Sequence, residues 1–265
     1  MNPFIEIIRP FTSFLSAFGV FVGAVVAGVP ISISMALAIM ASFLISGAGI
    51  VLNDYYDIDI DRINAPKRPL PSGRMGKRAA LAFGFILFAA GIVMAYFINA
   101  FCLAIAALNT VLEILYARNF KKIAILGNAT DSWFVASTFL FGAAISADFT
   151  IASMLAALAF LANMGREIFG DMEDLEGDKA LGLKTLPVIA GTRISRISGS
   201  VFILAAVAMS ALPYYMGLLS INYVMAVAVA DAIFIISIFQ DPVKNQKTTK
   251  IAMLAALLAF LLGSI

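Results

Sequence analysis

The sequence has no histidine and only one cysteine, Cys102. The absence of histidine excludes histidine acid–base chemistry, a Ser-His-Asp triad and histidine metal ligands. A single cysteine excludes an intrachain disulfide, thiolate zinc sites and cysteine-ligated iron–sulfur clusters. Any metal ion that the chain binds must therefore take oxygen ligands, and such ligands favour magnesium, calcium or manganese.

Charged residues are scarce as well. They make up 13% of the 265 residues, while 62% of the residues are apolar. Soluble domains have about a quarter charged and about half apolar residues, so this composition is typical of a polytopic membrane protein. Because a transmembrane helix needs about 20 residues, nine such helices would use most of the chain. We predict an all-α membrane protein in which residues 1–265 form a single transmembrane domain.

Nine apolar runs predict the transmembrane helices. Charged stretches separate some of them, such as 53–77 and 168–196, and turn-forming residues separate others, such as Gly28-Val29-Pro30 and Asp241-Pro242. The predicted spans cover about residues 11–31, 33–52, 78–97, 99–116, 125–146, 149–167, 197–213, 219–239 and 249–264.

The basic residues predict the orientation of these spans. All 18 Lys and Arg residues lie before span one or around the connections that follow spans two, four, six and eight. The opposite loops contain none. Because cytoplasmic loops are enriched in Lys and Arg, the basic side is predicted to be cytoplasmic. The N-terminus and the basic loops of this multi-pass protein of the cell membrane are then inside, and the C-terminus is outside.

Two acidic clusters follow spans two and six, and we name them the first and second aspartate motifs. The first consists of Asp54, Asp57 and Asp61, and the second of Asp171, Asp174 and Asp178. Both have the spacing i, i+3, i+7, which brings three carboxylates to one helix face if the helix continues through the motif. Their matching places predict two pseudo-repeated four-helix halves with cytoplasmic motif loops.

Carboxylates repeated on one helix face repel each other, so they need a compensating charge. Divalent cations between the two motifs would provide it, because Mg²⁺ prefers hard oxygen ligands and leaves positions free for phosphate oxygens. Basic residues follow both motifs or lie in the loop after span four, and they fit a multiply charged anion such as pyrophosphate. They are Arg62, Lys67, Arg68, Lys121, Lys122, Lys179 and Lys184.

The runs NDYYDIDIDRINAPKRP (53–69) and DMEDLEGDKALGLKTLP (171–187) resemble the two signatures of the UbiA superfamily of intramembrane prenyltransferases. Nine spans and cytoplasmic motif loops also match that family, so the resemblance covers essentially the whole chain. The first run is most similar to the archaeal branch, whose members make digeranylgeranylglyceryl phosphate for ether lipids. The resemblance implies a Mg²⁺-dependent enzyme that transfers a prenyl group from an allylic pyrophosphate.

The resemblance assigns catalysis to the six aspartates of the two motifs, and it assigns roles to further residues. It implies Mg²⁺ ligands at Asn53, Asp57, Asp61, Asp174 and Asp178. Tyr116 and Lys121 match donor-binding residues of the family, and Arg9, which precedes Pro10, matches a residue near the acceptor's anionic group. The predicted substrate-binding residues are Arg9, Asn53, Arg62, Lys67, Arg68, Tyr116, Lys121, Lys122 and Lys179.

Two acceptor classes remain open. In the archaeal branch, a geranylgeranyl group passes to the free hydroxyl of geranylgeranylglyceryl phosphate, a lipid-like acceptor. The alternative is an aromatic acceptor such as 4-hydroxybenzoate or another quinone precursor. A cation transporter is more remote, because transporters place ligands near the membrane midplane, whereas 10 of the 16 acids lie in 53–78 and 166–196. We expect membrane lipid around the protein and no nucleic acid partner.

Three further acids, Glu113, Asp131 and Asp231, lie within the predicted spans. An acid inside a membrane span is a candidate functional residue by default. Glu113 and Asp131 are near the cytoplasmic ends of their spans, where they could assist the polar site. For Asp231, near the middle of its span, we favour a hydrogen bond between helices.

Overall fold

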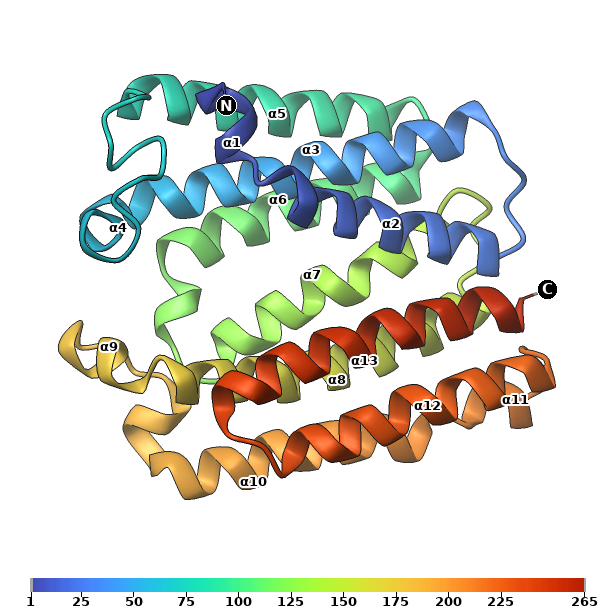
Figure 1. The fold of residues 1–265 in the computed structure, drawn as a ribbon. Coiled ribbons are helices and arrows are strands. Elements are labelled where there is room, and N and C mark those ends of the chain that lie inside the picture. Colours follow the sequence, from blue (N-terminus) through green and yellow to red (C-terminus); the bar gives the residue numbers. More distant parts are fainter. Residues whose placement is uncertain (1, 265) are drawn as a thin grey trace.

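The computed structural model describes residues 2–264, which form helices with one isolated backbone bridge. The long helices run back and forth beside one another (Figure 1). Within the described residues those of 17 residues or more are α2 (Pro10–Val26), α3 (Ile33–Tyr56), α5 (Lys77–Tyr96), α6 (Ala100–Arg118), α7 (Leu126–Ala143), α8 (Thr150–Glu173), α10 (Leu186–Met209), α12 (Ile221–Ile238) and α13 (Pro242–Gly263). The short helices are α1 (Pro3–Ile7), α4 (Ile58–Asn64), the 3-10 helix η1 (Phe120–Lys122), α9 (Leu175–Ala180) and α11 (Leu212–Tyr215).

Most of the long helices are suited to a membrane. In residues 2–264, seven helical stretches are long and apolar enough to cross a bilayer, namely α3, α5, α6, α8, α10 with α11, α12 and α13. Helix α2 is apolar but has 17 residues, and α7 contains Asn128, Asp131 and Ser132. Many large apolar side chains face outward, among them Ile86, Val229 and Leu258, as expected where lipid surrounds the helices. The protein is a multi-pass, all-helical membrane protein.

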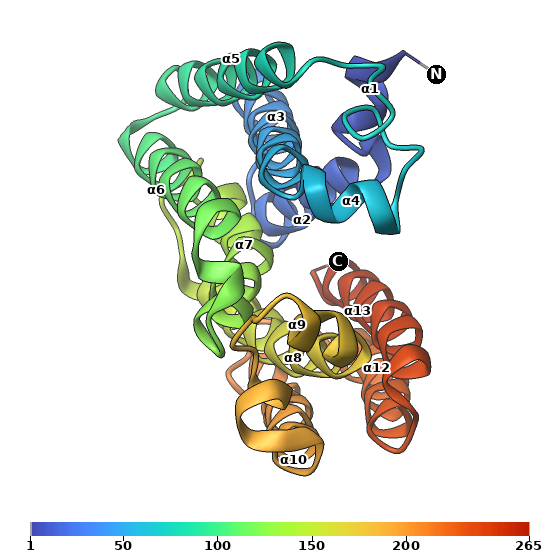
Figure 2. The same ribbon diagram turned by 90° about the vertical axis from the view of Figure 1, so that its left-hand side faces the viewer.

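The two halves of the chain lie on opposite sides of α7. Helices α2, α3, α5 and α6 form one group, and α8, α10, α12 and α13 form the other (Figure 2). Helix α7 packs against α2 and α6 on one side and against α8 on the other. Helix α13 also packs against α2, so the two groups meet a second time.

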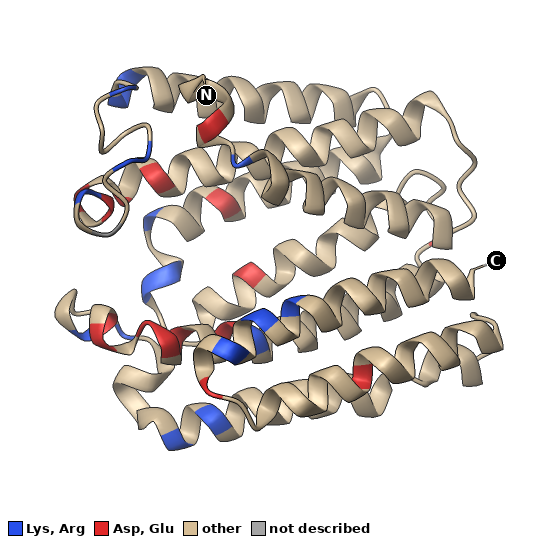
Figure 3. Cartoon of the chain, viewed as in Figure 1, with Lys and Arg blue, Asp and Glu red and all other residues tan. Residues whose placement is uncertain are grey.

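Both aspartate motifs lie at one end of the molecule, where α4 and α9 are found (Figure 1). The Lys and Arg residues lie in the same half of the molecule (Figure 3). Both motif-bearing helices, α3 and α8, have 24 residues, and each is followed by a short helix.

The helix does not continue unbroken through either motif, so the condition for three carboxylates on one helix face is not met. Helix α3 ends at Tyr56 and α4 begins at Ile58, so Asp57 lies at the bend between them. The second motif bends at the matching residue, Asp174, between α8 and α9. The two bends have nearly the same backbone angles, φ −95° and ψ 6° at Asp57 and φ −89° and ψ 4° at Asp174. The bends direct the last aspartate of each motif along a separate short helix.

Two helices begin earlier than the apolar runs predicted. Helix α10 starts at Leu186, not near 197, and contains a break at Gly191, where φ is +82°. Helix α13 starts at Pro242, not near 249, and its N-cap Asp241 accepts a hydrogen bond from the Lys244 amide. Asp followed by Pro is a helix start signal, so the pair predicted to separate two spans instead begins the last one.

Candidate active site

The buried carboxylates of the first aspartate motif are held by arginines. Arg9 donates a hydrogen bond of 2.5 Å from Nη2 to Asp54 Oδ1. Arg68 Nη1 lies 2.7 Å from both carboxylate oxygens of Asp61 and 3.6 Å from Asp54 Oδ1. Asp54 and Asp61 are only 3% and 5% exposed. Because buried charges must be paired, these arginines permit two carboxylates to lie close together below the surface.

Arg9 reaches Asp54 through an unusual backbone conformation. It lies between α1 and α2 with φ +44°, in the left-handed region that non-glycine residues rarely adopt. Pro10 follows as the first residue of α2, a position that suits proline. We predicted an acceptor-binding role for Arg9, and its contact with the first aspartate motif is an arrangement that sequence reasoning did not foresee.

The connection between α6 and α7 joins the two motifs. Lys121 Nζ lies 2.5 Å from Oδ1 of Asp57, the bend residue of the first motif. The neighbouring backbone pairs with Lys184, which follows the second motif: the Lys184 amide donates to the Lys122 carbonyl, and the Ala124 amide donates to the Lys184 carbonyl. Residues 121–124 therefore fix both motif regions relative to each other.

The second aspartate motif is held by neutral side chains. Asn128 Nδ2, in the first turn of α7, donates a 2.9 Å hydrogen bond to Asp171 Oδ2, and the Thr185 hydroxyl donates a 2.7 Å bond to Asp178 Oδ2. Asp174, at the bend, is exposed. Burial raises the pKa of the Asp178 carboxyl, although the Thr185 hydrogen bond stabilises its charged form. A nearby cation would counter that effect of burial.

Four of the predicted substrate-binding residues are exposed and are not paired with the aspartates of the two motifs in the described structure. Arg62 pairs with Asp59 and Lys179 pairs with Glu176, and all four side chains are more than half exposed. Lys67 and Lys122 are exposed as well. These residues belong to the short motif helices or to loops, and their side chains are exposed there.

A large cavity begins at the first motif and extends between the helices. It has a volume of about 560 Å³ and is lined by residues of α2, α3, α6, α7, α8 and α13, and we name it the central cavity. Asn53 and Tyr116, both predicted binding residues, line it, together with apolar side chains such as Ile45, Phe141 and Leu257. The cavity thus joins a polar end near the motifs to an apolar interior.

One side of the central cavity carries a polar network, of which the sequence analysis singled out Asp131 but not its partners Asn163 and Arg166. Asn163 Nδ2 donates to Asp131 Oδ2 at 3.0 Å, and Arg166 Nε donates to Asn163 Oδ1 at 3.0 Å. Arg166 also pairs with Asp131, at 3.6 Å, and with Glu167. We name Asp131, Asn163 and Arg166 the polar wall. The sequence offered one signal for this network: Asn163 and Arg166 are polar residues about one turn apart at the end of an apolar span.

The residues of the two motifs fit a hard metal ion. Within residues 2–264, no three carboxylates form a ready-made metal cluster, and Arg9, Arg68 and Lys121 pair with those of the first motif. Asn53 nevertheless has a buried Oδ1 without a hydrogen-bond partner in the described structure. An amide oxygen that lacks a partner and is next in sequence to the carboxylates of the first motif suits Mg²⁺, which prefers oxygen ligands.

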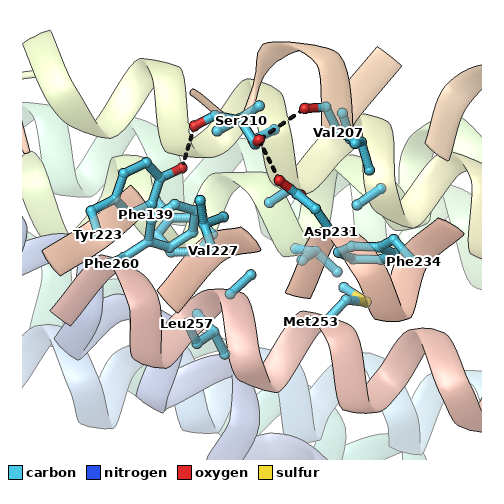
Figure 4. A pocket seen from close by; sticks show the side chains of 16 residues that line it. Phe139, Val207, Ser210, Tyr223, Val227, Asp231, Phe234, Met253, Leu257 and Phe260 are labelled. Atoms are coloured by element: carbon cyan, nitrogen blue, oxygen red, sulfur yellow. Dashed lines mark hydrogen bonds between the residues drawn. The ribbon is translucent and has the colours of Figure 1, made fainter. Parts of the chain in front are cut away.

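Asp231 is used for helix packing, as we interpreted it. The Ser210 hydroxyl, just after α10, donates a 2.7 Å hydrogen bond to Asp231 Oδ2 on α12, and the Tyr223 hydroxyl donates to the Ser210 carbonyl at 2.6 Å. These side chains border a small cavity of about 80 Å³ with apolar walls (Figure 4). Four residues line both this cavity and the central cavity, so they lie between the two: Val135, Phe139, Met253 and Leu257.

Substitution of Lys121 by Ala tests the contact between the connecting loop and the first motif. If the protein is a prenyltransferase, as its motifs suggest by resemblance, we expect the KM for a prenyl pyrophosphate donor to rise about tenfold, because an ammonium group beside Asp57 is lost. The KM for the acceptor should change little. Lys244→Ala is the control, because that side chain is 74% exposed and its ion pair in the described part of the chain is with Asp241. An equal rise in the KM for both substrates would contradict a place for Lys121 in the donor site.

Comparison with known proteins gives a consistent result. The sequence matches the UbiA prenyltransferase family over residues 16–263. It is 42% identical over 267 residues to the digeranylgeranylglyceryl phosphate synthase of Methanopyrus kandleri, with 98% of each chain covered. A solved structure described as giving insights into digeranylgeranylglyceryl phosphate synthase in membranes is 34% identical and superimposes with a TM-score of 0.87, covering 99% of this chain and 98% of the other.

A more distant structure has the same fold. The UbiA homolog from Archaeoglobus fulgidus bound to GPP and Mg²⁺ is 20% identical, with a TM-score of 0.78, and the match covers 99% of this chain and 100% of that one. The family match, the relatives and the shared fold all extend over nearly the entire chain and include both aspartate motifs. The protein described here therefore belongs to the UbiA prenyltransferase family.

Proposed function

We propose that the protein transfers a geranylgeranyl group from geranylgeranyl pyrophosphate to the free hydroxyl of geranylgeranylglyceryl phosphate, a step in archaeal ether-lipid synthesis. The observation that carries this proposal is the central cavity, which joins a polar end at Asn53 and Tyr116 to an apolar interior. Such a shape suits substrates that have an anionic head and a long isoprenoid tail. The relatives that carry the name digeranylgeranylglyceryl phosphate synthase support the choice of acceptor.

Mg²⁺ is the proposed cofactor. Asn53, Asp57, Asp61, Asp174 and Asp178 would hold it, with Asp54 and Asp171 beside them. When bound, Mg²⁺ neutralises the pyrophosphate and makes it a better leaving group. The Mg²⁺ in the complex of the Archaeoglobus homolog supports this choice of metal.

The chain's own residues would bind and orient the donor. Lys121, next to Asp57, places a positive charge where the pyrophosphate would lie. Arg9 and Arg68 offset the negative charge of the buried aspartates, and they keep these carboxylates in fixed orientations. Fixed charges around a leaving group lower the barrier because they need little reorganisation during the reaction. The apolar lining of the central cavity would hold the tail and keep water from the allylic cation.

We also propose the orientation and the internal relationship of the helices. The nine long helices would each cross the membrane, with the N-terminus and the motif loops in the cytoplasm and the C-terminus outside. The side on which Lys and Arg gather supports this orientation (Figure 3). The two halves would be structural repeats within a single domain. The matching bends at Asp57 and Asp174 support that relationship.

A transfer assay on the purified protein in lipid tests the function. Geranylgeranyl pyrophosphate and Mg²⁺ would be supplied with either geranylgeranylglyceryl phosphate or 4-hydroxybenzoate, and the products separated by chromatography. We expect an ether product with the glyceryl phosphate and none with the aromatic acid. Product from the aromatic acid alone would contradict the proposed acceptor and would assign the enzyme to quinone synthesis.

A further inference from the structure

The polar wall is not among the residues that we propose to hold the pyrophosphate, yet it faces the central cavity. Asp131, Asn163 and Arg166 all line that cavity. Asn163 is fully buried, and the Asp131 side chain is 29% exposed. Burying this much polarity within membrane-spanning helices is unfavourable, so such groups usually serve a function. The proposed reaction requires a proton to leave the acceptor hydroxyl, and no residue has yet been assigned to receive it.

The depth of Asp131 in the membrane follows from its place relative to the second motif. On α7, Asn128 binds Asp171, and Asp131 follows it by three residues, about one turn further into the membrane. On α8, Asn163 and Arg166 precede Asp171, so they also lie further from the motif end. Asp131 is therefore about one turn beyond the carboxylates that would hold the pyrophosphate. The first carbon of the prenyl chain, which is attached to the pyrophosphate, would lie at this depth.

Asn163 and Arg166 hold the carboxylate of Asp131 in a fixed orientation. Asn163 donates to Oδ2 at 3.0 Å, and the Arg166 guanidinium lies 3.6 Å from the same oxygen. Arg166 is itself fixed, because its Nη1 donates to Gln246 Oε1 on α13 at 3.0 Å. A catalytic base needs such support to present one oxygen to its substrate. Helices α7, α8 and α13 together provide it.

A second acid in the cavity lacks that support. Glu113 also lines the central cavity, but within residues 2–264 no hydrogen bond or ion pair to its carboxyl is found. Its carboxyl lies against Gly49, where a Cβ atom would collide with it. The close approach of α3 and α6 at Gly49 accounts for the position of Glu113. Asp131 is the acid that the surrounding residues orient toward the cavity.

We propose that Asp131 is the catalytic base of the transfer reaction, an inference that rests on the proposed function. The acceptor hydroxyl oxygen forms a bond to C1 of the prenyl donor. The C1–O bond to pyrophosphate breaks, and the pyrophosphate leaves with the bonding electrons. The hydroxyl proton passes to the Asp131 carboxylate and is then released toward the motif end of the cavity. Glu167 shares the Arg166 guanidinium with Asp131. Asn163 and Arg166 are positioning residues.

Asp131→Asn in the full-length enzyme in lipid is the first test. We expect kcat with geranylgeranylglyceryl phosphate to fall by about 10²- to 10⁴-fold, which is the usual contribution of general base catalysis. The KM for the donor should change less than threefold, because the pyrophosphate site is unchanged. Asp231→Asn is the matched control, since it replaces an intramembrane Asp whose partner is Ser210, and it should retain wild-type kcat.

Asp131→Gly with added formate separates a base from a structural residue. A small carboxylate can enter the space left by the side chain and accept the proton. Formate should therefore raise the kcat of Asp131→Gly at least tenfold. A kcat of Asp131→Asn within threefold of wild type, or no restoration of Asp131→Gly by formate, would overturn the assignment while leaving the proposed function intact. A wild-type enzyme that alkylates only 4-hydroxybenzoate would instead overturn the proposed function and, with it, the acceptor hydroxyl from which this base is proposed to take the proton.

Discussion

Asp57→Asn and Asp174→Asn should each lower Mg²⁺-dependent turnover by on the order of 10²- to 10³-fold, the usual loss when a key electrostatic group is removed. The two residues lie at the matching bends of the two motifs, and each is a proposed Mg²⁺ ligand. Asparagine keeps the shape of the side chain and removes one negative charge, so helix geometry should be unaffected. Steady-state rates at increasing Mg²⁺ concentration measure the loss, and part of it should be recovered at high Mg²⁺.

The chain offers close controls for both variants. Asp59 is two residues from Asp57, but its side chain is 79% exposed and pairs with Arg62. Glu176 is two residues from Asp174, and its side chain is 88% exposed. Asp59→Asn and Glu176→Gln should therefore keep nearly full turnover. If the controls lose as much activity as the bend variants, turnover depends on the total negative charge at this end of the molecule. That outcome would contradict a defined metal site. If one bend variant is active, its motif does not hold Mg²⁺.

The general architecture could be predicted because the membrane imposes strong constraints on sequence. Every backbone group must be paired within the bilayer, so apolar runs of sufficient length indicate helices. Helix ends were less predictable where a helix continues beyond the bilayer. Arg196 illustrates this point: it lies within α10 and donates from Nη1 to the Gln240 carbonyl at 2.9 Å. Arg196, the charged residue just before the predicted span 197–213, is thus part of the helix. Its hydrogen-bond partner, Gln240, lies just beyond the end of α12.

The site was predictable in its residue types and less so in its contacts. The spacing of the aspartates identified both motifs, but it did not predict the bends at Asp57 and Asp174, which depend on the packing of two short helices. Nor does spacing reveal that Arg9 and Asp54, 45 residues apart, form a pair. The polar wall is a third example, because Asp131 and Asn163 lie on different helices and come together only when α7 packs against α8. Contacts between distant segments require the folded structure.

Gly142→Ala should lower the thermal unfolding temperature by roughly 5 °C or more, because α2 and α7 cross without space for a side chain. A Cβ atom at Gly142 would lie 2.5 Å from the Ala24 amide nitrogen, and one at Gly23 would lie 2.5 Å from the Phe139 carbonyl oxygen. Backbone atoms cannot turn aside as a flexible side chain can, so the helices must separate. Overpacking of this kind costs about 1–3 kcal/mol. Gly76→Ala is the control, since nothing lies within 4 Å of the added Cβ there.

The double variant Gly23→Ala/Gly142→Ala gives the stronger test of this crossing. Both glycines serve the same contact between α2 and α7, so the separation that accommodates one methyl group should partly accommodate the other. The combined loss of stability should therefore be smaller than the sum of the two single losses. Both helices line the central cavity, so activity should fall together with stability. Additive losses would mean that the two positions are independent, and unchanged stability of Gly142→Ala would mean that the helices are not in close contact.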